Sequence, residues 1–193
     1  MELMGGDLRT FTNSRHELLG YAQQIGIMQA IALGMSQLHG CGLLHKDLKA
    51  SNILVLPKSW TTNEEGDESL NTFIPAKREF YFTKVGDYDS LDHVGGTGFW
   101  RAPEVLQALR DGSDVKLAQS PAVYSLGMVC YEILIILIPL QGHPLSNYEL
   151  VLSGRQPELP DDVRPKMREL VHHCWHMDPR QRPDWDELKK IVA

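Results

Sequence analysis

The apolar segment from residue 123 to residue 140, VYSLGMVCYEILIILIPL, constrains the fold of this chain most. It holds eighteen residues, and Glu132 is the only charged one. A spanning helix needs about 20 apolar residues, and a carboxylate at its centre costs about 2.5–3.5 kcal/mol or more in lipid. No cluster of Lys or Arg flanks the segment to anchor it. We therefore expect the buried central helix of a globular domain, with a membrane span as the minor alternative.

The composition is that of an ordinary globular domain. The 193 residues are 42% hydrophobic and 23% charged, which fits one domain and excludes disordered or collagen-like chains. A net charge of −6 argues against a nucleic-acid partner. The three cysteines (Cys41, Cys130 and Cys174) lie far apart, so we expect no disulfide framework and a reducing compartment, the cytoplasm. The first residues lack the cationic start and apolar stretch of a secretory signal.

The hydrophobic pattern predicts a mainly α-helical domain with a small β-hairpin element. Apolar residues recur at helical spacing in four segments: 17–40, 103–110, 122–138, and 163 to the end. Two short apolar runs, 53–56 and 80–85, predict strands. Between these runs, the polar and acidic residues 57–79 predict a long surface loop inserted into the domain.

Polar residues suited to phosphate chemistry surround the two expected strands. Asp47 and Asn52 precede the first strand, and Asp87 follows the second. If the two strands pair, the side-chain oxygens of these three residues lie close together and would suit Mg²⁺. Lys49 would neutralise the charge of a phosphate group as a point charge. A carboxylate that the metal does not need could accept a hydroxyl proton. Taken singly, each of these residues is better explained by the capping of a turn, but the ordered set is not.

Three motifs in their order resemble those of protein kinases. His45–Asn52 (HKDLKASN) is similar to the catalytic loop, whose pattern is His-Arg-Asp-Leu-x-x-x-Asn. Asp87-Tyr88-Asp89 stands in the place of Asp-Phe-Gly, and Ala102-Pro103-Glu104 matches the end of an activation segment. Because three spaced motifs agree over most of the chain, chance is a poor explanation.

Finer features resemble the serine/threonine kinases. Lys49, two residues after Asp47, and the pair Gly96-Thr97 are similar to that class, and the ending Cys174–Pro183 looks like its tyrosine-kinase-like group. The resemblance implies transfer of the γ-phosphoryl group of ATP to serine and threonine hydroxyls of a protein substrate.

The resemblance also implies catalytic roles for three residues. Asp47 resembles the base that orients and deprotonates the substrate hydroxyl. Lys49 would contact the transferring phosphate. Thr97 would sit beside Asp47 and help to position the acceptor.

The nucleotide would be held by a second group of residues. Asn52 and Asp87 would bind the Mg²⁺ ions that bridge the phosphates of ATP, and Leu54 would form the apolar floor beneath adenine. Glu104 and Arg182 resemble a structural ion pair that braces the substrate platform.

The resemblance places residues 1–193 in the C-terminal lobe of a kinase domain, with residues 1–10 as a remnant of the hinge between lobes. No Gly-x-Gly-x-x-Gly and no Val-Ala-x-Lys precedes the catalytic loop. We therefore expect the chain alone to bind Mg-ATP weakly or not at all. We also expect self-association, or capture by a partner, through an uncovered apolar interlobe face; its residues are Leu3, Met4, Leu8, the strand 53–56 and Tyr88.

The missing nucleotide-binding lobe and two substitutions, Asp89 and Ala122, favour an alternative function, that of a catalytically inactive pseudokinase-like scaffold or binding module. Asp89 replaces the glycine of the metal loop, where glycine allows backbone angles that other residues resist. Ala122 replaces an aspartate that braces the catalytic-loop backbone in the family. A separate substitution, Lys46 for the usual arginine, keeps the charge but loses bidentate recognition of phosphate, which argues against control by phosphorylation of the activation loop.

Overall fold

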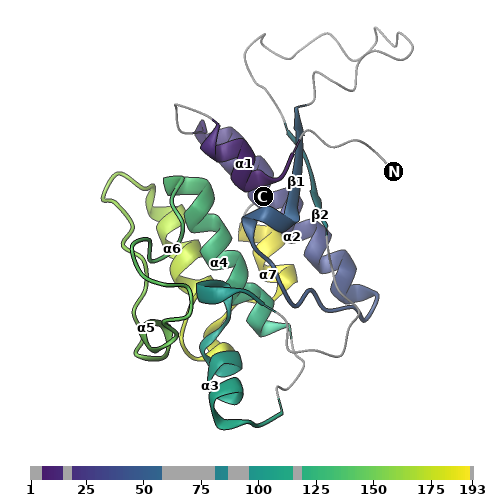
Figure 1. Cartoon of the computed structure of the whole chain (residues 1–193). Coiled ribbons are helices and arrows are strands. Elements are labelled where there is room, and N and C mark those ends of the chain that lie inside the picture. The colour runs from purple at the N-terminus through teal and green to yellow at the C-terminus, as the bar shows by residue number, and fades with distance from the viewer. Residues whose placement is uncertain (1–5, 15–18, 58–80, 87–95, 115–118, 192–193) are drawn as a thin grey trace, which may run out of the picture.

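The computed structural model describes residues 6–14, 19–57, 81–86, 96–114 and 119–191 (Figure 1). The helices are α1 (Leu8–Asn13), α2 (Tyr21–Gly40), α3 (Pro103–Asp111), α4 (Ser120–Ile135), α5 (Glu149–Leu152), α6 (Pro165–Cys174) and α7 (Trp185–Ile191). Short 3₁₀ turns are η1 (Ala50–Asn52), η4 (Gly98–Trp100) and η5 (Pro179–Gln181). The strands β1 (Ile53–Pro57) and β2 (Tyr81–Val85) pair in antiparallel fashion. The predicted mainly α fold with a small hairpin is confirmed.

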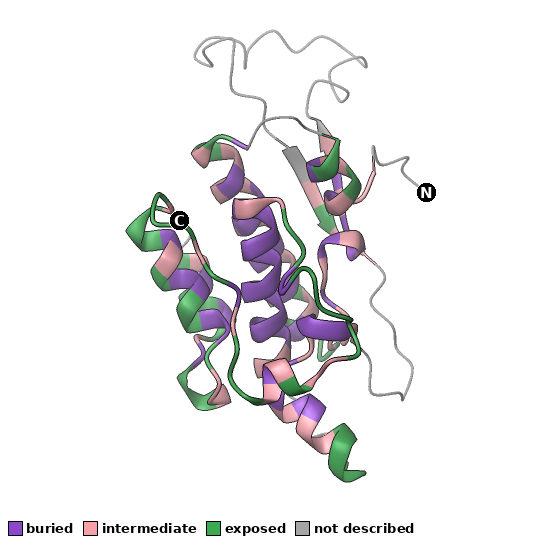
Figure 2. Ribbon diagram, turned by 60° about the vertical axis from the view of Figure 1, so that its left-hand side comes forward, coloured by how far each residue is buried: buried purple, intermediate pink, exposed green. Residues whose placement is uncertain are grey.

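Helix α4 is the centre of the core. Every residue from Ala122 to Leu134 is buried, as the run of purple along this helix shows (Figure 2). Helix α6 packs closely on it, because a Cβ atom on Gly127 would lie only 3.0 Å from Cβ of Cys174. The prediction of a buried central helix is confirmed. Within the described ranges, no helix is long and apolar enough to cross a bilayer.

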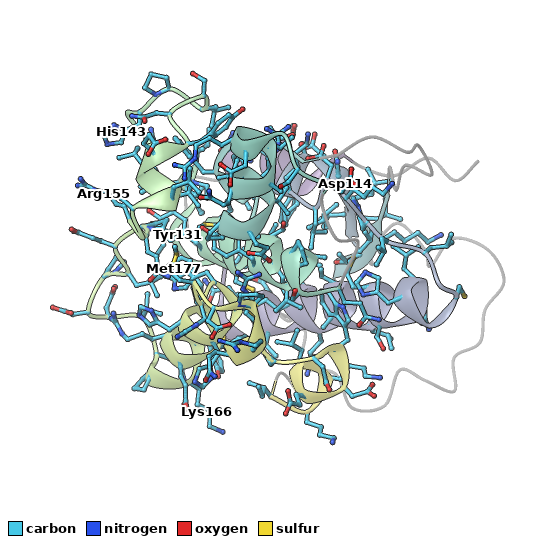
Figure 3. The ribbon with its side chains drawn as sticks, turned by 90° about the horizontal axis from the view of Figure 1, so that it is seen from below. Asp114, Tyr131, His143, Arg155, Lys166 and Met177 are labelled. Carbon is cyan, nitrogen blue, oxygen red and sulfur yellow. The ribbon has the colours of Figure 1, made fainter. Side chains whose placement is uncertain are left out.

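The view from below separates core residues from surface residues (Figure 3). Tyr131 of α4 lies among the helices, whereas His143, Arg155 and Lys166 lie at the outer surface. Helix α2 packs against the hairpin on one side and against α7 on the other. All three cysteines carry free thiols.

Helix α4 ends three residues earlier than the predicted residue 138. Ile136 takes a left-handed conformation with φ 58°, and its N–H donates to the carbonyl oxygen of Glu132 over 2.9 Å. Periodicity could not reveal this end, because residues 136–138 are apolar and contain no glycine. A β-branched residue in this conformation is strained by about 1–2 kcal/mol.

We expect the Ile136→Gly variant to be more stable than the Ile136→Ala variant by about 0.5–1 kcal/mol. Both variants lose the half-buried isoleucine side chain, but only glycine also removes the left-handed strain, and this gain exceeds the extra entropy that glycine adds to the unfolded chain. Urea unfolding measures the difference. At the control position Ile138, which is exposed and has ordinary backbone angles, glycine should not be more stable than alanine. A stability of Ile136→Gly equal to or lower than that of Ile136→Ala contradicts the assignment of strain.

Other predicted boundaries were wrong for local reasons. Helix α2 begins at Tyr21 rather than at residue 17, after Gly20 in extended conformation. The helix predicted from 163 to the end is broken between α6 and α7, where Asp178 caps η5 and Pro179 follows it. Helix α1, which was not predicted, begins within residues 1–10 because the Asp7 carboxylate caps it at the N–H of Thr10. The predicted loop 57–79 lies outside the described residues except for Pro57, which ends β1.

The predicted uncovered apolar face is wrong for three of its residues. Leu8, Ile53 and Val55 are buried, with 1% exposure or less, because α1 packs on β1 and on η1. Only Leu54 and Leu56 of that strand are half-buried. The remaining members of the face, Leu3, Met4 and Tyr88, lie outside the described residues.

Candidate active site

The predicted meeting of the two strand ends is confirmed. Ile53 lies opposite Val85, and the Gly86 N–H donates to the carbonyl oxygen of Asn52 over 2.9 Å. The loop before β1 therefore lies directly beside the residue that precedes Asp87. Asp87 itself, together with Asp89, lies outside the described residues.

The Asp47 carboxylate contacts the side chains of Lys49 and Thr97, which come from two segments far apart in the chain. Lys49 Nζ donates to Oδ2 over 2.5 Å, and Thr97 Oγ1 donates to Oδ1 over 2.8 Å. Lys49 Nζ also donates to Thr97 Oγ1 over 2.7 Å, which closes a ring of three groups. Fifty residues separate Asp47 from Thr97 in the chain, so the fold itself assembles this group.

Asn52 completes the group and leaves one oxygen for a ligand. Its Nδ2 donates to the Asp47 carbonyl oxygen over 2.8 Å and to Asp47 Oδ2 over 3.3 Å. Among the described residues no donor bonds its Oδ1. A fixed amide oxygen beside an ionised carboxylate is the hard donor set that Mg²⁺ prefers, so the residues present fit this ion. No cluster of three His, Cys, Asp or Glu side chains suited to a metal occurs in the described part of the chain.

His45 is a structural member of the site that sequence analysis did not assign. Its Nδ1 accepts the N–H of Asp47 over 3.2 Å, which places the ring proton on Nε2. That nitrogen donates to the Gly86 carbonyl oxygen over 3.1 Å. The buried imidazole thus ties the loop of Asp47 to the end of β2. The sequence feature that could have revealed this role is the histidine at the first position of the loop motif.

The pKa of Asp47 lies below its ordinary value. Burial alone raises the pKa of this carboxyl, but hydrogen bonds from Lys49 and Thr97, with the charge of Lys49, lower it further than burial raises it. The carboxylate is therefore ionised at neutral pH and holds both partners in place.

This pKa shift predicts a pH-dependent contribution to stability. A lowered folded-state pKa contributes stability that is complete above the unfolded value, 3.8, and is lost as the pH falls through the folded value. We expect the Asp47→Asn variant to lose less unfolding free energy than the wild-type chain between neutral pH and pH values below about 4. Urea unfolding at several pH values tests this. Parallel losses in both proteins contradict it.

Leu54 lies near the site but on a different face from the core. The side chains of a strand alternate, so the burial of Ile53 and Val55 directs Leu54 to the opposite side. A Cβ atom on Gly86 would lie 3.4 Å from its Cδ1 atom. Leu54 therefore adjoins the chain that leads into Asp87.

The predicted ion pair of Glu104 and Arg182 is confirmed. The two guanidinium nitrogens donate to the two carboxylate oxygens over 2.6 and 2.8 Å, and the Arg182 side chain is fully buried. Arg182 also donates to the carbonyl oxygens of Ser120 and His176. The pair thereby joins the start of α3 to the start of α4 and to η5.

A buried carboxylate, Glu132, links α1 to η4, a contact that sequence analysis missed. Its oxygens accept Arg9 Nη2 over 2.5 Å and Trp100 Nε1 over 2.7 Å, and the Arg9 guanidinium lies 4.8 Å from the centre of the Trp100 ring. Burial raises the pKa of Glu132, although Arg9 and Trp100 act in the opposite direction. Glu132 is the only charged residue in an apolar segment, and this feature could have indicated that its carboxylate has a buried partner.

Comparisons with known proteins agree with this arrangement. A family model described as protein tyrosine and serine/threonine kinase matches residues 1–192. The chain is 32% identical, over 96% of its length, to a light-sensor protein kinase of Ceratodon purpureus, and 30% identical, over 96%, to the dual specificity protein kinase pyk3 of Dictyostelium discoideum. It is 27% identical, over 97%, to the serine/threonine/tyrosine-protein kinase HT1 of Arabidopsis thaliana. These matches cover 16%, 13% and 44% of the respective relatives, so the chain spans less than half the length of each.

Proposed function

The chain belongs to the protein tyrosine and serine/threonine kinase family, and on that premise we propose that its Asp47 site serves phosphoryl transfer from ATP to serine and threonine hydroxyls of proteins. The observation that carries the proposal is the ring formed by Asp47, Lys49 and Thr97, with Asn52 beside it. The name of HT1, a serine/threonine/tyrosine-protein kinase, includes serine and threonine and supports these two residues as acceptors.

Each group of the ring has a task in this proposal. The ionised Asp47 orients the acceptor hydroxyl and takes its proton as the oxygen attacks phosphorus. Thr97 fixes the carboxylate rotamer and lines the acceptor position. Lys49 supplies a positive charge where the transferring phosphoryl group would pass. ATP would supply the phosphoryl group, and bound Mg²⁺ would neutralise its phosphate charge.

The nucleotide would lie against the hairpin. Asn52 Oδ1 would bind Mg²⁺ together with Asp87, and Leu54 would contact the base. We expect the chain alone to bind Mg-ATP with a dissociation constant weaker than the low micromolar range, since no glycine-rich loop precedes the site in this sequence. Calorimetric titration tests this expectation. Low-micromolar binding, about −8 kcal/mol, contradicts it.

The assay for activity uses the chain joined at Met1 to the nucleotide-binding lobe of a kinase. We expect this joined protein to phosphorylate a generic serine- and threonine-containing protein in the presence of Mg-ATP. No transfer by the joined protein, when the donor kinase is active under the same conditions, contradicts the proposed function.

A pseudokinase-like scaffold is the second candidate function, and Asp89 and Ala122 favour it. Ala122 is buried in α4 with 5% exposure, so this position offers no acceptor to the catalytic loop. The joined protein carrying both Asp89→Gly and Ala122→Asp separates the candidates. Activity only in this double variant favours the scaffold, and activity without the changes favours the kinase.

Location and association remain predictions. Three free thiols are compatible with the reducing cytoplasm. We still predict self-association at tens of micromolar, and the described residues that support this prediction are the half-buried Leu54 and Leu56. Light scattering after size-exclusion chromatography measures the mass, and a 21.8 kDa monomer contradicts this prediction.

A further inference from the structure

Arg101 carries a positive charge beside the candidate site that no described carboxylate neutralises. Its Nη1 donates to the Tyr148 hydroxyl over 3.0 Å, and this is the only hydrogen bond of the Arg101 side chain within the described residues. None of the ion pairs that these residues form includes it. Its Nε atom is buried without an acceptor. Because a guanidinium has five N–H donors, most of the hydrogen-bonding capacity of Arg101 is unused.

The Arg101 side chain packs against Gly96, beside the Asp47–Thr97 contact. Gly96 has φ 106°, and a Cβ atom there would lie 2.8 Å from Cγ of Arg101 and 3.3 Å from the carbonyl oxygen of Lys46. Gly96 directly precedes Thr97, and Lys46 directly precedes Asp47. Arg101 therefore lies next to the position that an acceptor hydroxyl takes when it contacts Asp47 and Thr97.

The loop between α4 and α5 holds Arg101 in this place. The guanidinium carbon lies 5.7 Å from the centre of the Tyr148 ring, in addition to the bond with its hydroxyl. Three residues before Tyr148, the exposed Leu145 packs on Gly98, where a Cβ atom would lie 3.0 Å from its Cδ2. The cation is thus half-buried and oriented, and it is not a freely moving surface arginine.

We propose that Arg101 selects protein substrates that carry an acidic group, carboxylate or phosphate, within three residues of the acceptor hydroxyl. This inference rests on the proposed function, because it uses the acceptor position at Asp47. A guanidinium binds carboxylate and phosphate oxygens in pairs, which a lysine does not do. An extended peptide rises about 3.3 Å per residue, so three residues on either side span the surroundings of Arg101.

Peptide binding to the full chain without nucleotide tests this proposal separately from catalysis. The probes are fluorescein-labelled, alanine-rich peptides with one central serine. In each peptide, one of the three positions on either side of this serine holds a glutamate, a phosphoserine or a glutamine. Fluorescence anisotropy gives the dissociation constants. We expect glutamate or phosphoserine to bind about 5- to 10-fold more tightly than glutamine at one flanking position at least, and the ratio to fall with added salt. Comparison of the dissociation constants of the glutamate and phosphoserine peptides shows whether the site prefers carboxylate or phosphate.

Charge reversal assigns the preference to Arg101. The Arg101→Glu variant should lose the preference for acids and bind glutamine at the same position more tightly than glutamate, and Arg101→Lys should keep a smaller preference for acids. The matched control, Arg155→Glu, makes the same charge change at an exposed arginine (Figure 3) and should retain the wild-type preference. Thermal unfolding checks that each variant folds, and Arg101→Lys remains informative if the glutamate variant does not.

Three outcomes overturn the inference: no preference for acids in the wild-type chain, an equal preference in Arg101→Glu and Arg155→Glu, or no peptide binding up to about 1 mM. Acid-selective binding through Arg101 without any phosphorylation by the joined protein overturns only the proposed function. Phosphorylation without any acid preference overturns only this inference.

Discussion

The Asp47→Asn variant of the joined protein is expected to transfer phosphoryl groups about 100-fold more slowly than its parent, or more slowly still. Asparagine keeps the shape of the side chain but cannot take the hydroxyl proton, and it removes the charge that holds Lys49 Nζ at 2.5 Å. Initial rates with a generic protein substrate measure the effect.

An exposed aspartate provides the control for this experiment. The Asp162→Asn variant makes the same chemical change at the surface, between α5 and α6, and should keep the parental rate. Circular dichroism and thermal unfolding verify that both variants fold. A rate for Asp47→Asn within a few-fold of the parental rate shows that Asp47 is not the base.

The Glu132→Ala variant is expected to lose about 3–5 kcal/mol of unfolding free energy. The change leaves the Arg9 cation without its carboxylate and the buried Trp100 Nε1–H without its acceptor. The Trp100 donor is then buried without an acceptor, and the Arg9 guanidinium, whose side chain is 25% exposed, loses the carboxylate that balances its charge. Such a loss is a large part of the stability of an ordinary domain, about 5–15 kcal/mol.

Equilibrium unfolding in urea, followed by tryptophan fluorescence, measures this loss. The Glu149→Ala control removes an exposed carboxylate whose contact with Arg110 is 3.6 Å long, and should change stability by less than about 1 kcal/mol. The Trp100→Phe variant keeps a ring but removes the donor, and should fall between the two. Equal midpoints for Glu132→Ala and Glu149→Ala contradict the structural role of Glu132.

The sequence predicted those parts of the site whose arrangement depends on residues close together in the chain. The loop pattern around Asp47 and the two flanking strands were sufficient to bring Asn52 beside the chain that enters Asp87. Hydrophobic periodicity sufficed for α4, because a helix that is apolar on all sides has few places outside a core.

Long-range partners of polar groups were harder to predict. The links from Glu132 to Arg9 and Trp100 cross 123 and 32 residues, and no local pattern encodes which cation a buried carboxylate will meet. The bond from Arg101 to Tyr148 depends in the same way on the path of the loop after α4. The prediction of where a helix ends failed where the backbone adopts a conformation that the residue type disfavours, as at Ile136.

The measurement that tests the central claim most directly is the identity of the residues that become phosphorylated. The joined protein and its Asp47→Asn variant are incubated with Mg-ATP and a peptide library rich in serine, threonine and tyrosine, and the products are mapped by mass spectrometry. The account predicts phosphoserine and phosphothreonine that depend on Asp47. Phosphate on tyrosine alone, or equal phosphorylation by both proteins, contradicts it.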